Sequence, residues 1–153
     1  MDHAGTRIIA AQRTKVWQHL TSPESLAYCI PGCETVAGSV ETGFDMVVRR
    51  KLGLFTLHFA GTIDLADVVP ARSVTLVGRG KGGVAGLAKG SARIRLVDHP
   101  GGTEITWGLG ALLEGRVARL GRQPIEAMVA TMTAHFVERL EEVLQQDTGT
   151  DPV

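Results

Sequence analysis

Four titratable side chains lie on segments in which apolar and polar residues alternate: Asp45, His58, Asp64 and Glu104. Acid–base catalysis needs such groups to face a shared interior, within reach of a substrate. Alternation along a strand instead places them on the face opposite to apolar neighbours such as Phe59 and Trp107. We therefore expect no pair of inward carboxylates and no catalytic residue.

Three other polar side chains come closer to an apolar face. His135 falls at the edge of an apolar helical stripe, Arg139 within that stripe near its end, and Tyr28 on a short predicted helix. Nucleophilic catalysis requires a nucleophile, a base and an orienting group, and no such spacing occurs. A lone polar group beside a cavity more often orients a ligand or satisfies the backbone.

The two cysteines, Cys29 and Cys33, flank Pro31-Gly32. In a cytoplasmic chain we expect free thiols instead of a disulfide. Further ligands at metal-binding spacing are missing, so we expect no metal site and no cofactor.

A glycine-rich stretch covers residues 78–90 and contains a GxGxxG pattern at residues 78–83. A dinucleotide site would require a helix next, and residues 84–90 are too short and too glycine-rich for one. We predict a mobile hairpin instead. Its functional form would be a flap at the mouth of a cavity. With the turn before Cys33 included, the predicted mouth or flap residues are Pro31, Gly32, Gly80, Gly83 and Gly86.

The longest predicted element is a helix over residues 117–146. Its apolar residues recur at helical spacing on one side, which indicates a stripe that packs on an apolar surface. Pro124 falls inside this range, so we expect a kink or a late start there. The stripe consists of Ile125, Met128, Val129, Met132, Phe136, Leu140 and Val143.

The methionine pair Met128 and Met132 suggests that this stripe borders a cavity, because methionine adapts to irregular apolar ligands. Ordinary core packing produces the same pattern and stays open as an alternative. The predicted cavity wall on the helix is Ile125, Met128, Val129, Met132 and Phe136. The predicted wall on the strands is Met46, Val48, Leu57, Phe59, Ile94, Trp107 and Leu109.

The elements that would hold these walls follow a simple order. A first strand at residues 7–11 precedes two short helices, at 15–20 and at 23–28, the second with cap residue Ser22 followed by Pro23. Short turns then separate six strands, which predicts an antiparallel meander. The strands are expected at 33–40, 44–52, 55–68, 73–77, 91–97 and 103–113.

Length and charge narrow the class of protein. The 153 residues carry 16 basic and 16 acidic side chains, so nothing electrostatic favours a nucleic-acid partner. We expect one domain over residues 1–147 with a short polar tail at 148–153. With no secretory signal and no apolar run long enough to span a bilayer, a soluble, cytoplasmic protein is the expectation.

Three arginines, Arg116, Arg119 and Arg122, recur where the long helix is expected to begin. Positive charge there opposes the helix dipole. A solvated surface is the simpler interpretation. The functional interpretation is a docking patch for an acidic partner or an anionic membrane surface.

Several motifs resemble one family: Val16-Trp17, Ser22-Pro23-Glu24-Ser25-Leu26, and above all Ile30-Pro31-Gly32-Cys33-Glu34. With the glycine-rich stretch and Leu120-Gly121-Arg122, they are similar to the family of the carbon monoxide dehydrogenase G subunit over about residues 6–145. The resemblance implies an α+β helix-grip (START-like) fold, in which a curved antiparallel sheet of about seven strands wraps a long C-terminal helix around a ligand cavity.

The family also implies a function. The resemblance implies a non-catalytic accessory protein of a molybdenum-containing carbon monoxide dehydrogenase-type hydroxylase, since members of the family are implicated in membrane recruitment or in handling a quinone-like acceptor. We therefore expect a carrier of a small lipophilic, aromatic or isoprenoid ligand. The alternatives are a polyketide cyclase or aromatase-like enzyme that uses the same cavity, and a protein-docking module without a ligand.

Overall fold

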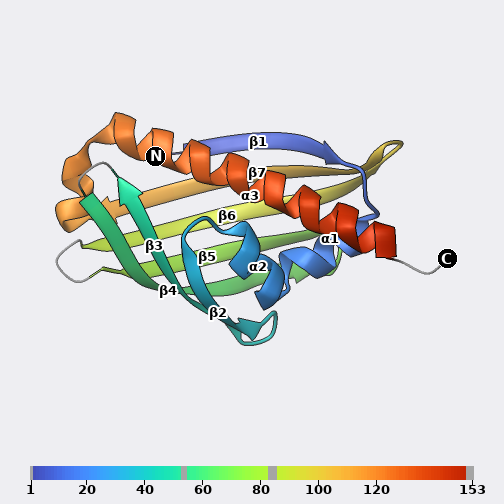
Figure 1. Ribbon diagram of the computed structural model, residues 1–153, viewed down its shortest axis with the longest axis horizontal. Coiled ribbons are helices and arrows are strands. Elements are labelled where there is room, and N and C mark those ends of the chain that lie inside the picture. Colours follow the sequence, from blue (N-terminus) through green and yellow to red (C-terminus); the bar gives the residue numbers. More distant parts are fainter. Residues whose placement is uncertain (1, 53–54, 83–85, 151–153) are drawn as a thin grey trace.

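The computed structural model describes residues 2–52, 55–82 and 86–150. Seven strands form one antiparallel sheet in the order β1-β7-β6-β5-β4-β3-β2, as Figure 1 shows. The strands are β1 (Asp2–Ile9), β2 (Cys33–Ser39), β3 (Gly43–Leu52), β4 (Phe55–Val69), β5 (Ser73–Lys81), β6 (Leu87–His99) and β7 (Gly102–Glu114).

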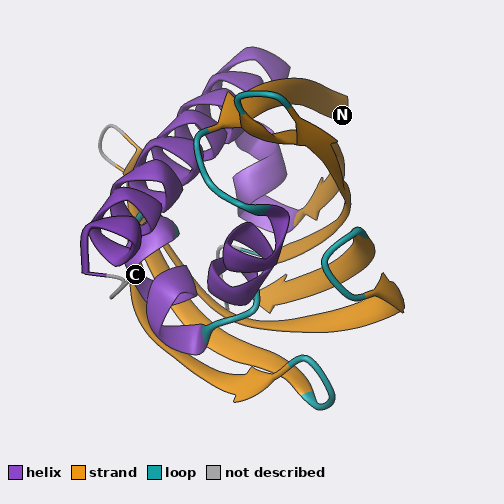
Figure 2. Cartoon of the chain, turned by 90° about the vertical axis from the view of Figure 1, so that its right-hand side faces the viewer, coloured by secondary structure: helices purple, strands orange, loops and turns teal. Residues whose placement is uncertain are grey.

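The helices lie on one side of this sheet. Figure 2 shows the sheet curving around them, with the long helix across the open side of the curve. They are α1 (Arg13–Leu20), α2 (Pro23–Cys29), the 3₁₀ helix η2 (Gly115–Leu120) and α3 (Arg122–Thr150). The predicted α+β helix-grip architecture is confirmed.

The helix boundaries follow local chemistry. The hydroxyl of Ser22 accepts from the amide of Ser25 and Pro23 takes the first position of α2, as the sequence predicts. Gly121, with φ of 93°, ends η2, and α3 then begins at Arg122. Pro124 therefore falls in the first turn, where its missing N–H has no intrahelical partner to lose. The predicted late start is confirmed, and residues 115–120 are a separate 3₁₀ helix.

Other boundaries differ from the sequence prediction. Strand β1 starts at Asp2 because it pairs along β7 from Gly110 to Thr103, a partner that local patterns cannot reveal. Helix α3 continues to Thr150, so part of the predicted polar tail is helical.

The glycine-rich stretch is mostly strand: β5 and β6 pair as an antiparallel hairpin and extend beyond the predicted strand bounds of 73–77 and 91–97. Gly78 and Gly80 belong to β5, Gly90 belongs to β6, and Gly78 pairs directly with Gly90. The sheet ladder needs only backbone groups, so paired glycines continue it without side chains. Of the predicted flap residues, Gly83 lies outside the described residues.

The solid core lies under the C-terminal half of α3. Leu140 and Leu144 are at most 2% exposed and pack with buried residues of α1 and the sheet, including Ile9, Val16, Leu96 and Ile105. A smaller cluster joins Leu26 of α2 to Phe44 and Met46 of β3. The side chains of these clusters leave the space under the N-terminal half of α3 less filled.

Candidate ligand-binding cavities

The first cavity has a volume of about 230 Å³ and lies between the middle of the sheet, α3 and the α1–α2 segment. Thr133 is the only polar residue that lines it among the described residues, and its hydroxyl already donates to the Val129 carbonyl at 2.7 Å. The other lining residues are Leu20, Ile30, Pro31, Leu76, Ala92, Ile94, Ile105, Trp107, Leu109, Met132, Phe136 and Val137. The cavity therefore suits an apolar group.

The second cavity has a volume of about 320 Å³ and lies under the first turns of α3. Its floor consists largely of glycine and alanine from β4, β5, β6 and β7. Thr62, Arg79 and Lys89 also border it; they form one row of paired, exposed residues and alternate with the inward glycines. The apolar wall and floor are Met46, Val48, Phe59, Gly61, Ile63, Gly78, Gly80, Ala88, Gly90, Ala111, Leu113, Met128 and Met132.

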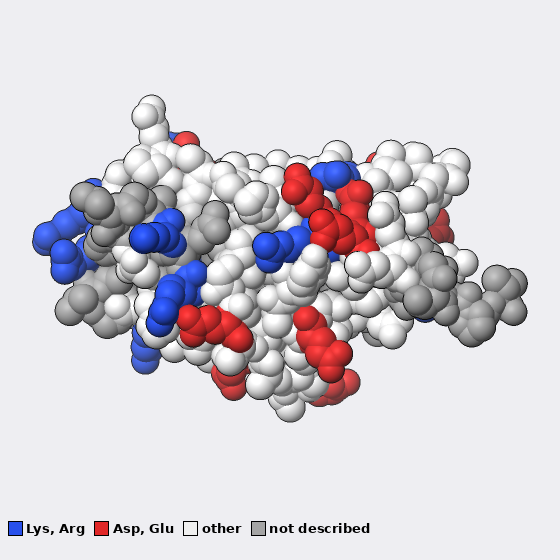
Figure 3. All heavy atoms as spheres, in the orientation of Figure 1, with Lys and Arg blue, Asp and Glu red and all other residues white. Residues whose placement is uncertain are grey.

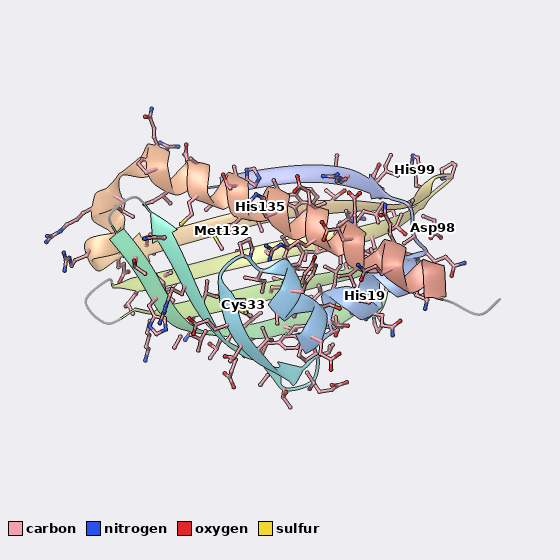
Figure 4. The ribbon with its side chains drawn as sticks, viewed as in Figure 1. His19, Cys33, Asp98, His99, Met132 and His135 are labelled. Carbon is pink, nitrogen blue, oxygen red and sulfur yellow. The ribbon has the colours of Figure 1, made fainter. Side chains whose placement is uncertain are left out.

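Met132 lines both cavities, and it is the only described residue that does so. Figure 4 shows it on the side of α3 that faces the sheet. Below it, the two floors are successive rows of the same strands. Leu76, Ala92 and Leu109 pair across β5, β6 and β7 under the first cavity, and the next inward row is Gly78, Gly90 and Ala111 under the second.

The predicted strand wall divides between the two cavities. Ile94, Trp107 and Leu109 line the first, and Met46, Val48 and Phe59 line the second. The side chain of Leu57 lies outside the described residues.

The predicted helix wall is only partly at the cavities. Phe136 lines the first cavity, Met128 the second and Met132 both, whereas Ile125 and Val129 line neither. Ile125 is 7% exposed and enclosed by protein in the first turn of α3. Val129 is half-buried and belongs to neither lining.

The predicted mouth residues have different roles. Pro31 is buried and lines the first cavity. Gly32 and Gly86 line neither cavity; both have positive φ, and a Cβ on either would lie 2.0 Å from a carbonyl oxygen, of Arg49 and Glu114 respectively. They are therefore required by close backbone approach. Gly80 forms part of the floor of the second cavity.

Small floor residues are what sequence reasoning missed. Gly61, Gly78, Ala88 and Ala92 occupy inward positions where strand alternation predicts larger apolar side chains, and this absence of bulk creates the space. The available signal was their alternation with polar neighbours, as in Ala92, which lies between Ser91 and Arg93.

Trp107 shapes the first cavity with the help of a glycine. Gly5 pairs with Trp107 across β1 and β7, and a Cβ on Gly5 would lie 2.5 Å from Cζ2 of the indole. The ring thus rests on bare backbone. Its Nε1 is buried and no described group accepts a hydrogen bond from it.

Several polar and charged side chains form hydrogen bonds or ion pairs between elements, outside the linings of the two cavities. The Tyr28 hydroxyl donates to Glu142, the Arg139 guanidinium donates to the Tyr28 carbonyl at 2.8 Å, and its carbon lies 5.4 Å from the centre of the Tyr28 ring. The bond to Glu142 raises the pKa of Tyr28. These contacts hold α2 against α3, so Tyr28 and Arg139 act between helices and line neither cavity. An ion pair between Arg7 and Glu141 likewise joins β1 to α3.

Both cysteines are free thiols. Burial raises the pKa of the Cys29 thiol from 9.0 to about 11, and burial also raises the pKa of Cys33. Cys29 packs in the core, 1% exposed, so it is a structural residue. Among the residues that the structure describes, no group of histidine, cysteine and acidic side chains is placed to hold a metal ion.

The predicted arginine patch is divided between two elements. Arg116 and Arg119 belong to η2 and Arg122 opens α3, and all three are exposed. Arg122 bonds Glu126 at 2.8 Å, which raises the pKa of the arginine and compensates part of the positive charge. In Figure 3, Lys and Arg gather at the end of the molecule that carries η2 in Figure 1. No described helix is long and apolar enough to cross a membrane.

Solved structures share this fold. A conserved protein from Geobacillus kaustophilus superposes with a TM-score of 0.88 at 20% identity, covering 96% of this chain and 97% of that chain. An uncharacterised protein from Rhizobium leguminosarum has a TM-score of 0.74 at 16% identity, with 95% of each chain covered. Protein CV1439 from Chromobacterium violaceum has a TM-score of 0.68 at 14% identity, covering 94% and 96%. Identities this low show the fold alone.

Sequence comparison is more specific. The family model of the carbon monoxide dehydrogenase G subunit (CoxG) matches residues 5–145. Among curated proteins, none matches the chain.

Proposed function

The chain belongs to the CoxG family of carbon monoxide dehydrogenase proteins, and from this premise we propose that it is a non-catalytic carrier that binds a small lipophilic molecule, quinone-like or isoprenoid, between the sheet and α3. It would serve as an accessory protein of a molybdenum-containing carbon monoxide dehydrogenase-type hydroxylase. The proposal that the chain binds a ligand rests on the pair of apolar cavities, of about 230 and 320 Å³. Small-molecule sites have volumes of this order, roughly 300–1,000 Å³.

The chemistry of the lining supports binding by apolar burial. Thr133, the only polar residue among the described ones that line the first cavity, has its hydroxyl engaged within α3. A ligand that buries about 300 Å² of apolar surface gains about 7.5 kcal/mol at about 25 cal/mol per Å², before the cost of immobilising it. That gain needs no charged anchor.

The alternative of a cyclase-like enzyme needs a proton donor or acceptor within reach of the bound molecule. The described residues that line the first cavity include no titratable group. Arg79 and Lys89 border the second, and they are exposed on the face opposite to the glycine floor. The carrier is therefore the better-supported function.

The accessory role is proposed from family membership, and the arginine patch offers a surface for it. Arg116, Arg119 and Arg122 lie at one end of the molecule and would contact an acidic face of the hydroxylase or an anionic membrane surface.

Extraction of the purified protein with organic solvent, followed by mass spectrometry, tests the carrier. We expect one lipophilic molecule per chain, enriched over a sample of unrelated protein from the same cells. An extract without such a molecule, together with no binding of naphthoquinone or isoprenoid alcohols by calorimetry, would refute the carrier.

A further inference from the structure

We propose that the two cavities are the halves of one channel that takes a single elongated lipophile, which passes beneath Met132. This inference rests on the proposed function and adds the length and the shape of the ligand. It predicts that a chain long enough to fill both halves is bound in preference to a compact molecule that fills one.

The floor of the two cavities is continuous. On β6 the inward residues Ile94 and Ala92 lie under the first cavity, and Gly90 and Ala88 lie under the second. These are consecutive inward positions of one strand. No strand end, bulge or turn separates the two halves, because β5, β6 and β7 keep an unbroken register across this boundary.

The length of the channel follows from that strand. From Ile94 to Ala88 the chain advances six residues, which at about 3.3 Å per residue is about 20 Å. The channel is therefore much longer than a single ring. The row that crosses the boundary runs from Ala92 to Gly90, where the side chains are a methyl group and a hydrogen atom, so nothing rises from β6 to divide the two halves.

The two halves are separated from the helix side, by a side chain of α3. Met132 is the only described side chain common to both linings. A methionine side chain is unbranched and has three rotatable bonds, so it can change rotamer and lie along a ligand. Met128, one turn earlier, faces the second half, and Phe136, one turn later, faces the first. The helix thus presents one flexible residue at the junction and a separate wall to each half.

Two isoprenoid alcohols test the channel by stoichiometry. Geraniol has two isoprene units and geranylgeraniol has four. We expect calorimetry and native mass spectrometry to show up to two geraniol molecules per chain but one geranylgeraniol. We expect geranylgeraniol to bind at least about tenfold more tightly, because each additional buried carbon adds affinity.

Three variants of the full chain locate the path. Met132→Trp should block the junction, weakening geranylgeraniol by at least about tenfold while geraniol still binds. Gly78→Leu should fill the second half and leave one geraniol site. A Cβ on Gly78 would meet nothing closer than 3.8 Å, so this variant keeps the test decisive should the bulkier tryptophan disturb folding. Gly108→Leu, on the outer face with nothing within 4 Å, is the matched control and should bind as the unaltered protein does.

The outcomes separate the two proposals. Equal affinity for the two alcohols, or unchanged geranylgeraniol binding in both Met132→Trp and Gly78→Leu, would overturn the channel and leave a carrier of compact ligands. Failure of both alcohols and of naphthoquinone to bind, with no extractable lipophile, would overturn the carrier and the channel together.

Discussion

Gly78 and Gly108 would direct a side chain to opposite faces of the same sheet. A Cβ on Gly78 would lie 3.9 Å from Cγ1 of Ile63, on the cavity side, whereas a Cβ on Gly108 would have no neighbour within 4 Å. Neither glycine has positive φ. The same substitution at the two positions therefore adds a side chain to the cavity in one case and to the solvent in the other.

Gly78→Leu is expected to stabilise the ligand-free protein more than Gly108→Leu. Replacing glycine reduces the conformational entropy lost on folding equally in both variants. Only Gly78→Leu also buries its new side chain, which adds about 1–2 kcal/mol to the free energy of unfolding. Urea unfolding of both variants measures the difference. A Gly78→Leu protein that is less stable than Gly108→Leu would show that the second cavity is already filled.

Gly5→Ala is expected to displace the indole of Trp107 into the first cavity, because the new Cβ would lie 2.5 Å from Cζ2. We predict a loss of about 1–3 kcal/mol from overpacking and weaker binding of geraniol. Chemical unfolding and calorimetry measure the two effects. Gly101→Ala, whose Cβ meets nothing closer than 3.5 Å, is the control and should change neither quantity.

Leu140→Ala is expected to lower the free energy of unfolding by about 2–5 kcal/mol, because the side chain is fully buried in the solid core. Leu112→Ala, at a leucine that is 59% exposed, should change it by less than about 0.5 kcal/mol. Similar losses in the two variants would mean that the core does not lie under this half of α3.

Thr103→Val is expected to lower the free energy of unfolding by about 1–3 kcal/mol. Thr103 is fully buried and its hydroxyl donates to the Ala11 carbonyl at 2.7 Å, so valine of nearly equal size removes this donor from a buried oxygen. Thr103→Ser keeps the hydroxyl and should restore the part of the stability that the hydrogen bond supplies. Denaturant titration of both variants separates the bond from the lost methyl group.

The raised pKa of Cys29 predicts both reactivity and pH dependence. With a pKa of about 11, Cys29 stays a neutral thiol at pH near 8 and should react with iodoacetamide more slowly than the half-buried Cys33. In the unfolded chain the thiol ionises near its ordinary 9.0, so between 9.0 and about 11 the unfolded state binds fewer protons. The stability is therefore complete below that window and falls as the pH rises through it.

Peptide mapping after alkylation tests the order of reactivity, and urea unfolding at several pH values tests the linkage. Cys29→Ala removes this group, so its stability should fall less steeply over the same window than that of the unaltered protein. Parallel curves for the two proteins would contradict the assignment.

Strand alternation and punctuation were enough to predict most of the fold. The alternating stretch 55–68 is β4, Ser22 and Pro23 start α2, and the strain of Pro124 inside a helix places the start of α3. The two strands of the glycine-rich hairpin were predicted too short, because a paired strand needs no side chain and the pairing of Gly78 with Gly90 is not visible locally.

The site was only partly predictable for a similar reason. Alternation shows which face Leu76, Ala92 and Leu109 occupy, but only the register shows that they form one row under the first cavity. Helical spacing likewise groups Ile125 with Met132, although the first is enclosed by protein and the second borders open space. An apolar stripe shows which side of a helix is turned away from water, but it does not show whether that side packs against protein or borders a cavity.

The pairing of β1 with β7 also constrains how the chain folds as it leaves the ribosome. Thr6 lies opposite Thr106, 100 residues later, and every ladder contact of β1 is with β7. The first strand to be synthesised thus pairs only with the last one, and Ile9, which is 2% exposed in the folded chain, stays unprotected until then. Closing so long a loop slows folding, and this strand is the segment that a chaperone would have to shield during translation.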